Sequence, residues 1–359
     1  MNKVARGKVS SKSLSIVNGD MVYVGLDVHK KSIHAAVQVN GRIERHWVMP
    51  ANYAAVVAKL ESLRVGLRRI VYEAGPTGFG LARTLAAAGL PVDVIAPSKT
   101  PQPADQSAKS DRLDCFQLCE YAWSNRLLSV VAVPSERQEA DRQVQRLRDQ
   151  VIRKLRRVKQ QIKSLLLQYS IAEPEGLANW SAKSVAALGE LVLDAELRFC
   201  LDELLTELGQ LQGQVRRIND RIEQLGQTER HGAAMAVLTS HPGVGPITAM
   251  TFRTELHQAE QMSDGNQVAK YFGLSPRVRQ SGQTRRDGPI AKTGRGHVRA
   301  ILVQAAWRWI ARDESAKAVY DRLVHNTGLP QKAIVGMARR LAVRLWRMMT
   351  TGELYRPAA

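Results

Sequence analysis

The segment 22–39 combines two strand-like runs with a carboxylate at the end of the first run. Residues 22–26 are mostly apolar and β-branched or aromatic, and the run ends at Asp27. After a turn of two lysines, apolar and more polar residues alternate over 33–39. This pattern predicts a buried strand, a tight turn and a half-exposed second strand. An aspartate in an apolar strand is costly to bury unless it is paired or binds a cation. Asp27 is therefore either a turn-capping residue or a cation ligand.

Three further carboxylates follow in the first third of the chain. Glu73 ends a short β-rich run and precedes Ala-Gly-Pro-Thr-Gly. Asp111 and Asp114 begin a segment, 109–123, whose apolar spacing is roughly helical, and residues three apart share one helix face. Taken singly, Asp111 reads as a helix N-cap and Asp114 as a solvated residue. Together with Asp27 and Glu73, they predict an oxygen-rich cage suited to Mg²⁺ or Mn²⁺. On phosphodiester substrates, such cages activate the attacking oxygen and stabilise the leaving oxygen.

These motifs resemble those of the DEDD transposases and recombinases of insertion-sequence family 110/1111, which are related to the Piv invertases. The resemblance lies in Gly-Leu-Asp-Val-His-Lys around Asp27, in Tyr-Glu-Ala-Gly-Pro-Thr-Gly around Glu73, and in Ala-Pro-Ser-Lys-Thr-Pro followed by Lys-Ser-Asp-Arg-Leu-Asp. It implies that residues 21–133 have the RNase H-like fold of Holliday-junction resolvases and that the four carboxylates bind metal. Relatives usually have Ala where this chain has Cys115, a change that leaves the carboxylates in place.

The order of the expected elements up to residue 133 also favours an α/β domain. The expected strands and helices lie at 22–28, 33–39, 42–48, 53–63, 69–73, 78–89, 92–96 and 109–123. This order suits a mixed sheet flanked by helices. Residues 99–109 carry two prolines and no periodicity, so we expect a loop over the acidic pocket. Residues 1–20 are expected to be a disordered basic leader.

The formal net charge of +19 and the pI near 10.2 limit the kind of partner that the protein can bind. Such a charge implies a polyanion, with nucleic acid as the first candidate and an anionic membrane surface as the alternative. No run approaches the ~18 consecutive apolar residues of a spanning helix, and no signal peptide is recognisable. The three cysteines, Cys115, Cys119 and Cys200, form no metal or disulfide framework. We therefore expect a cytoplasmic protein without a membrane partner, and the resemblance implies a bacterial, nucleoid-associated one.

Two apolar series of helical period occupy the middle of the chain. The first runs over 144–165 at steps of three or four, and the second, over 204–225, alternates strictly between four and three. Sustained heptads of this kind predict coiled-coil helices. We expect a helical hairpin over 141–228 that packs on itself or on a second protomer. Residues 142–163 hold nine bases and one acid, so the first helix could also follow a phosphate backbone.

The C-terminal part, expected to be a mainly α-helical domain over 236–350, contains two candidate phosphate-binding turns. Pro-Gly-Val-Gly at 242–245 resembles the hairpin of a helix-hairpin-helix element, in which backbone N–H groups approach a phosphate; a plain helix–helix turn is the alternative. Residues 265–312 hold ten Lys/Arg and one acid, and a glycine-interrupted basic loop there precedes an apolar helix at 298–310. The predicted nucleic-acid contacts are Gly243, Gly245, Arg277, Arg279, Arg285, Arg286, Lys292, Arg295 and Arg299.

The same segment resembles the C-terminal transposase domain of that family, which has a nucleophilic serine in a Ser-Gly-rich loop. The matching position is Ser281, in Gln-Ser-Gly-Gln; many relatives have Ser-Ser-Gly-Gly, so this loop departs at Gln280 and Gln283. Without the resemblance, Ser281 is an ordinary loop serine, and Ser275 is the alternative nucleophile. No histidine lies near Ser281 in the sequence, so the metal site or neighbouring arginines would have to activate it.

Three functions follow from these observations. The first is a site-specific DNA transposase or recombinase that forms a phosphoserine-linked strand and exchanges strands through a junction; DNA inversion is a variant of it. The second is a metal-dependent Holliday-junction-type nuclease, and the third is a non-catalytic nucleic-acid scaffold. The resemblance further implies double-stranded donor and target DNA, a structured bridge RNA that guides the reaction, and a homo-oligomer, dimer or tetramer, in which one chain's acidic pocket meets another's serine.

Overall fold

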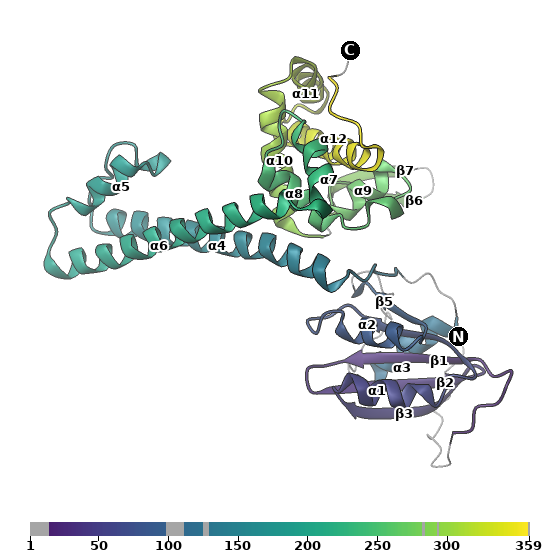
Figure 1. Ribbon diagram of the computed structural model, residues 1–359. Coiled ribbons are helices and arrows are strands. Elements are labelled where there is room, and N and C mark those ends of the chain that lie inside the picture. The colour runs from purple at the N-terminus through teal and green to yellow at the C-terminus, as the bar shows by residue number, and fades with distance from the viewer. Residues whose placement is uncertain (1–13, 98–110, 125–128, 282–283, 293, 358–359) are drawn as a thin grey trace. The chain divides into compact units, whose positions relative to one another are not determined.

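The computed structural model describes residues 14–97, 111–124, 129–281, 284–292 and 294–357 (Figure 1). The chain divides into two compact units, with the boundary between Ser135 and Glu136. The first unit is mixed α/β, and the second is helical apart from one β-hairpin. The predicted α/β class of the N-terminal part and the helical character of the remainder are confirmed. The basic leader, at residues 1–20, and the predicted loop at 99–109 lie largely or wholly outside the described residues.

A five-stranded mixed sheet forms the centre of the first unit. The strands are β1 (Val22–Val28), β2 (Ser32–Val39), β3 (Arg42–Pro50), β4 (Leu67–Glu73) and β5 (Val92–Ile95). Their order in the sheet is β3-β2-β1-β4-β5. Neighbours within β1–β3 are antiparallel, whereas β4 runs parallel to both β1 and β5. Strand β1 is therefore central and joins the antiparallel half of the sheet to the parallel half.

Helices cover both faces of this sheet because the central strands are apolar on both sides. The helices are α1 (Tyr53–Glu61), α2 (Gly80–Ala87) and α3 (Asp111–Trp123). Residues Val24 and Leu26 of β1 share a buried core with residues of α1 and α2. On the opposite face, Val71 and Ala36 pack against residues of α3. Successive side chains of a strand point to opposite faces of the sheet. Those on one face are therefore buried under α1 and α2, and those on the other face under α3.

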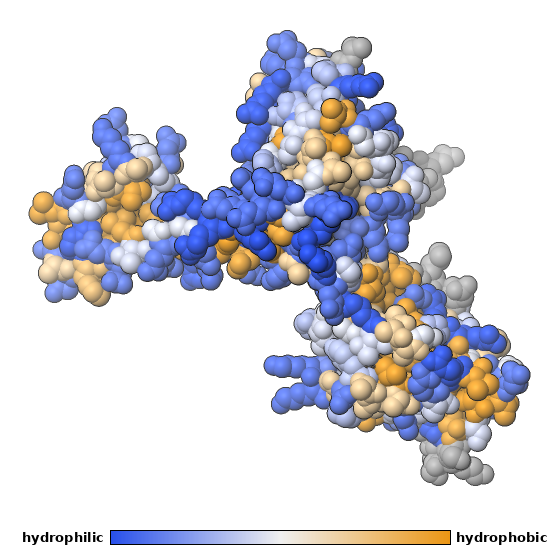
Figure 2. All heavy atoms as spheres, in the orientation of Figure 1, coloured by the Kyte–Doolittle hydropathy of each residue, from blue (hydrophilic) through white to orange (hydrophobic). Residues whose placement is uncertain are grey.

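A pair of long helices begins the second unit. They are α4 (Glu136–Gln168) and α6 (Ala195–Gly226), which lie side by side (Figure 1). The segment that connects them contains η2 (Leu177–Asn179) and α5 (Ala182–Gly189). Val158 and Ile162 of α4 and Ile222 of α6 are buried in one core. Much of the surface of this pair is hydrophilic (Figure 2), and Arg153 and Arg157 are among the exposed bases of α4. The helices contain the two predicted heptad ranges; a coiled coil and a second protomer on it stay predictions.

The remaining helices of the second unit pack on the same core. They are α7 (Glu229–Thr239), α8 (Pro246–Glu255), η3 (Ala259–Gln261), α9 (Gly265–Tyr271), α10 (Gly296–Ile310), α11 (Glu314–Thr327) and α12 (Pro330–Thr351). Between α9 and α10, β6 (Pro276–Ser281) and β7 (Thr284–Ile290) form an antiparallel hairpin. The two strands occupy positions where we expected a loop around Ser281, whereas residues 291–292 and 294–295, next to the glycine-interrupted turn, lie outside any strand or helix. None of the helices within the described ranges combines the length and apolar character needed to cross a membrane.

Candidate functional site

Two carboxylates leave the sheet side by side at the ends of parallel strands. The parallel register places Leu26 of β1 beside Tyr72 of β4. Asp27 and Glu73 are the next residues of the two strands, so they emerge at the same edge of the sheet. Tyr72 is fully buried, and its hydroxyl oxygen accepts a hydrogen bond from the Ala82 N–H at 3.1 Å. Packing on the interior thus fixes the strand end that carries Glu73.

Helix α3 brings a third carboxylate to this edge because it lies directly on β1. A Cβ atom on Gly25 would lie 2.5 Å from the Cys119 backbone nitrogen, so only glycine allows this approach. The Cys119 Sγ–H also donates to the Tyr23 carbonyl oxygen at 3.1 Å. Asp114 lies in the first turn of α3, on the part of the helix that passes over the end of β1.

Asp27, Glu73 and Asp114 line one pocket of about 710 Å³. Carboxylate oxygens are the ligands that Mg²⁺ and Mn²⁺ prefer, so the chemistry of the donor set fits a divalent cation. Among the side chains that the structure describes, however, no group of three or more His, Cys, Asp or Glu residues is arranged to hold a metal ion. Asp111 is the first residue of α3, and its side chain lies outside the described residues. The structure therefore brings three of the predicted carboxylates to one pocket without forming a complete ligand set.

The electrostatics of Cys115 are consistent with this arrangement. Burial, together with the negative charges of Asp27 and Asp114, raises the pKa of the Cys115 thiol to about 12. A thiolate next to two carboxylates is unfavourable, so the sulfur stays protonated. Its Sγ–H donates to the Arg112 carbonyl oxygen at 3.2 Å. Cys115 is therefore a neutral packing residue between α3 and the sheet.

Three histidines follow the antiparallel half of the sheet away from Asp27. The His29 Nε2 lies 3.0 Å from the Asp27 Oδ2, and the β1–β2 register places His34 opposite Asp27. The His34 ring lies 5.5 Å from that of His46, centroid to centroid. Burial lowers the pKa of His46, and so do the charges of His34 and Arg112. These histidines were not predicted from the sequence, although the expected turn between the first two strands already implied that a residue of the second strand faces Asp27.

The β6–β7 hairpin carries the predicted serine and three predicted arginines. Ser281 ends β6 and pairs with Thr284, at the end of the hairpin. The register sets Arg279 opposite Arg286. Like charges opposite each other weaken strand pairing, so an anion at this ribbon would stabilise it. The side chains of Ser281, Arg279, Arg285 and Arg286 lie outside the described residues. The alternative nucleophile, Ser275, is buried.

The turn before α10 has a backbone that requires glycine. Gly294 has φ +66°, and a Cβ there would lie 2.6 Å from the Tyr271 carbonyl oxygen. Lys292 also has a positive φ, of +55°, and its side chain is exposed, as is that of Arg295. Arg299 differs from them, because its Nη1 donates to the Phe272 carbonyl oxygen at 3.2 Å and burial lowers its pKa. Lys292 and Arg295 are thus open to a ligand, whereas Arg299 also holds the turn in place.

The two glycines before α8 have different surroundings. A Cβ on Gly243 would lie 2.5 Å from the Ala305 carbonyl oxygen, and the Gly243 N–H donates to the His241 Nδ1 at 3.3 Å. Gly243 is therefore required for packing against α10. Gly245 has open space around its Cβ position and precedes Pro246, the first residue of α8. The phosphate contact of this turn stays a prediction. Arg277, on β6, is exposed, and its Nη2 donates to the Ala291 carbonyl oxygen at 3.3 Å.

Two family models match the chain. A DEDD model of the IS110 type, described as "Transposase", matches residues 24–171, and a model described as "Transposase IS116/IS110/IS902 family" matches residues 235–321. Together they cover more than half of the chain. The first match contains the acidic pocket, and the second contains the hairpin and the basic turn.

Relatives of similar length align over most of the chain. The transposase for insertion sequence element IS1533 of Leptospira borgpetersenii is 25% identical over 90% of this chain and 94% of its own length. The transposase for IS1111A of Coxiella burnetii is 26% identical, over 87% of this chain and 84% of its own. The transposase for IS1328 of Yersinia enterocolitica is 29% identical, over 77% and 81% respectively.

Proposed function

The chain belongs to the DEDD transposases of the IS110 family, and from this membership we propose that it cuts and rejoins DNA strands with a carboxylate-bound metal and a serine nucleophile. The activity is that of an insertion-sequence transposase acting at specific DNA sites. The acidic pocket of the first unit and the β6–β7 hairpin of the second unit are its two functional parts.

Asp27, Glu73 and Asp114 hold the metal, with Asp111 as the fourth carboxylate. The observation that carries this proposal is that strand ends of β1 and β4 and the first turn of α3 contribute acids to one pocket. Membership of the DEDD transposases implies a divalent metal ion, and an all-oxygen donor set favours Mg²⁺ or Mn²⁺. When bound, such an ion polarises the phosphodiester and stabilises the oxygen that leaves. His29 orients Asp27, through the 3.0 Å contact between the His29 Nε2 and the Asp27 Oδ2.

Ser281 is the nucleophile that becomes linked to DNA. Its hydroxyl oxygen forms a new bond to phosphorus while the bond from phosphorus to the leaving sugar oxygen breaks, and the hydroxyl proton passes to a base in the site. Arg285 and Arg286, on the second strand of the hairpin, stabilise the charge that develops on the phosphate. A homo-oligomer, dimer or tetramer, supplies the pocket of one chain and the serine of another.

Donor and target DNA, together with a structured bridge RNA that pairs with both, are the partners. The support for two polyanions is the net charge of +19 and the exposed bases on α4, β6 and the turn before α10. The compartment is the bacterial cytoplasm, with the protein associated with the nucleoid. Sequencing the nucleic acid that copurifies with the protein identifies the RNA. Recovery of DNA alone would contradict the proposal that an RNA guides the reaction.

A suicide DNA substrate with a nick tests the serine mechanism. We expect the native chain, with Mg²⁺, to give a covalent protein–DNA adduct that denaturing electrophoresis resolves. Ser281→Ala should abolish the adduct and recombination while metal binding is unchanged, and Ser275→Ala should retain both. Asp27→Asn should abolish the adduct as well. Cleavage without an adduct in Ser281→Ala would instead identify the junction nuclease, in which metal-activated water attacks.

A further inference from the structure

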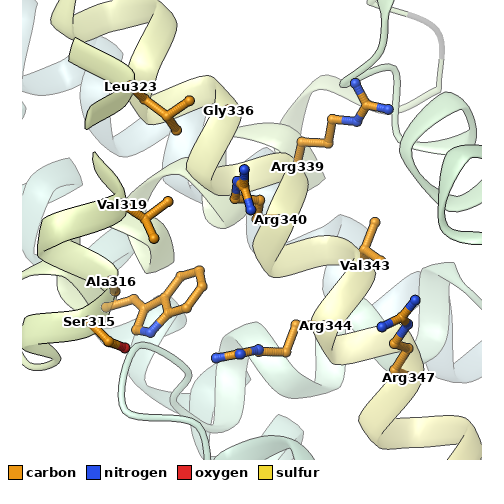
Figure 3. A pocket seen from close by; sticks show the side chains of 11 residues that line it. Ser315, Ala316, Val319, Leu323, Gly336, Arg339, Arg340, Val343, Arg344 and Arg347 are labelled. Atoms are coloured by element: carbon orange, nitrogen blue, oxygen red, sulfur yellow. The ribbon is translucent and has the colours of Figure 1, made fainter. Parts of the chain in front are cut away.

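A groove of about 610 Å³ lies between α11 and α12 of the second unit. Apolar side chains form much of its wall, including Val319 and Leu323 of α11 and Val343 of α12 (Figure 3). Gly336 of α12 leaves room between the two helices. Four arginines of α12 also line the groove, and the described lining includes no acidic side chain. An apolar groove bordered only by basic side chains is unusual, because basic residues on a protein surface normally have acidic residues among their neighbours.

Three of the four arginines lie along one side of α12. Arg340, Arg344 and Arg347 are separated by four and three residues, which places them on the same helix face. At about 1.5 Å per residue, they follow the helix axis at intervals of roughly 6 and 4.5 Å. All three line the groove, and their side chains extend in different directions from the helix (Figure 3). A linear polyanion can therefore contact more than one of them.

Two of the four arginines are held by the protein itself. The Arg339 Nη2 donates to the Asn266 Oδ1 at 2.9 Å. Arg344 stacks over the Trp309 ring, at 5.3 Å from its centroid, and over the Tyr355 ring, at 5.0 Å. Such cation–π contacts fix the guanidinium plane. Arg339 and Arg344 therefore shape the groove rather than remain available to a ligand.

The other two, Arg340 and Arg347, are exposed, and neither forms an ion pair or side-chain hydrogen bond within the part of the chain that the structure describes. The acid close to this end of the groove, Asp313, is already engaged. Its carboxylate accepts hydrogen bonds from the Trp309 Nε1, the Ala316 N–H and the Tyr355 hydroxyl. The charges of Arg340 and Arg347 are thus left without a protein counterion.

A ligand that matches this groove needs an apolar part and flanking negative charges. Double-stranded DNA presents phosphates, but its bases are stacked inside and cannot enter an apolar slot. An unpaired strand offers both, because its bases are free to be bound by apolar or planar side chains while its phosphates contact cations. The volume lies within the roughly 300–1,000 Å³ of small-ligand sites, which is ample for one base.

We propose that the α11–α12 groove binds an unpaired nucleotide of single-stranded DNA, with the base against the apolar wall and the flanking phosphates on Arg340 and Arg347. The inference rests on the proposed function, since strand exchange requires duplexes to open. Single strands released during exchange are then held by a site that is chemically independent of the metal and the serine.

Binding of a fluorescein-labelled single-stranded DNA to the full chain in EDTA tests the groove without any catalysis. Arg340→Glu and Arg347→Glu should each weaken binding about tenfold. Gly336→Leu fills the groove without changing its charge; a Cβ there meets only the Leu323 side chain, at 3.4 Å. It should weaken single-strand binding to a similar degree and leave duplex binding unchanged. Arg322→Glu, an equal charge change on an exposed α11 residue outside the groove, should retain single-strand affinity.

Several results would overturn the proposal. These are unchanged affinity in both arginine variants, an equal loss in Arg322→Glu, or equal losses for duplex and single strand in Gly336→Leu. Tighter binding of an RNA or an acidic peptide than of single-stranded DNA, lost in the same variants, would reassign the groove. Thermal unfolding curves exclude misfolded variants. The proposed function is tested in a different experiment: recombination that survives Asp27→Asn would contradict it. The binding assay contains no metal, so its result does not depend on that outcome.

Discussion

The His29 Nε2 lies 3.0 Å from the Asp27 Oδ2, so an imidazole from the turn after β1 holds one oxygen of the central carboxylate. The His29 side chain is about half exposed, whereas that of Asp27 is 20% exposed. The ring therefore borders the pocket and restrains the carboxylate without enclosing it. This contact gives His29 a positioning role in the site.

Replacing His29 tests that role. His29→Ala should weaken binding of Mn²⁺ by about 10- to 100-fold, the usual effect of losing a residue that orients a metal ligand. His29→Gln keeps a donor within reach and should recover part of the affinity. Isothermal titration calorimetry measures both, and equal affinity in His29→Ala and the native chain would contradict the assignment.

The acids of α3 should differ sharply in their importance. Asp114 lines the pocket, whereas Glu120, on the same helix, is exposed and does not line it. Asp114→Asn should lower strand transfer by more than the roughly 100-fold upper range for an orienting residue, because a carboxylate near the ion is lost. Glu120→Gln changes the same charge on the same helix and should have little effect. Rates of adduct formation at saturating Mg²⁺ compare the two, and similar losses would argue against Asp114 as a ligand.

The contact between β1 and α3 should tolerate no side chain at Gly25. Gly25→Val would force α3 away from the strand and destabilise the first unit by about 1–3 kcal/mol, the usual cost of overpacking. It should also lower activity, since Asp114 would move away from Asp27. Gly75→Ala is the control for stability, because its added methyl group meets nothing nearer than the Glu73 carbonyl oxygen at 3.8 Å. Urea unfolding measures both variants, and equal midpoints would contradict the close approach.

Stability of the second unit should fall in mild acid because of His241. Burial, together with the positive charge of Arg344, lowers the pKa of His241 to about 3. An unfolded histidine takes up a proton near pH 6.5, so below that pH the unfolded state binds more protons. The free energy of unfolding then falls by up to about 1.4 kcal/mol per pH unit as the pH drops from about 6.5 towards about 3. Above about 6.5, the contribution is constant.

His241→Asn isolates this effect, because the asparagine Oδ1 can accept the Gly243 N–H in place of the His241 Nδ1. The unfolding free energy of the variant should change less between about pH 7 and about pH 5 than that of the native chain. Burial opposes ionisation of Asp313, but hydrogen bonds from Ser315 and Tyr355 hold its pKa below the usual range. Asp313 therefore stays charged in this window. Parallel pH profiles for the two proteins would refute the prediction.

Much of the first unit could be predicted from local patterns. The strands expected at 22–28 and 33–39 appear as Val22–Val28 and Ser32–Val39, because apolar alternation over that length has few other solutions. The helical hairpin was expected to begin at residue 141, but in the structure its first helix begins at Glu136. Its first turns are polar, so the spacing of apolar residues does not reveal them. The acids in these turns favour a helix N-terminus and could have indicated where the helix begins.

The features that were missed depend on contacts between distant segments. The position of His46 beside His34 follows from strand register, and the α11–α12 groove arises only when two helices pack. The hairpin at 276–290 was hidden by its many bases, which favour a solvated loop until pairing is considered. For the site, the order of acids and strands was enough to bring Asp27 and Glu73 together, whereas the approach of Asp114 required the helix to rest on Gly25.

The burial of two thiols between α3 and the sheet has a practical consequence. Cys115 and Cys119 are buried, and burial raises the pKa of both thiols, so neither supplies the thiolate that maleimides attack. Cys200, on α6, is exposed. The native chain therefore carries a single reactive handle on its long helical pair. A fluorophore attached there, with no cysteine replaced, allows assembly of the protein on DNA to be followed by energy transfer between labelled copies.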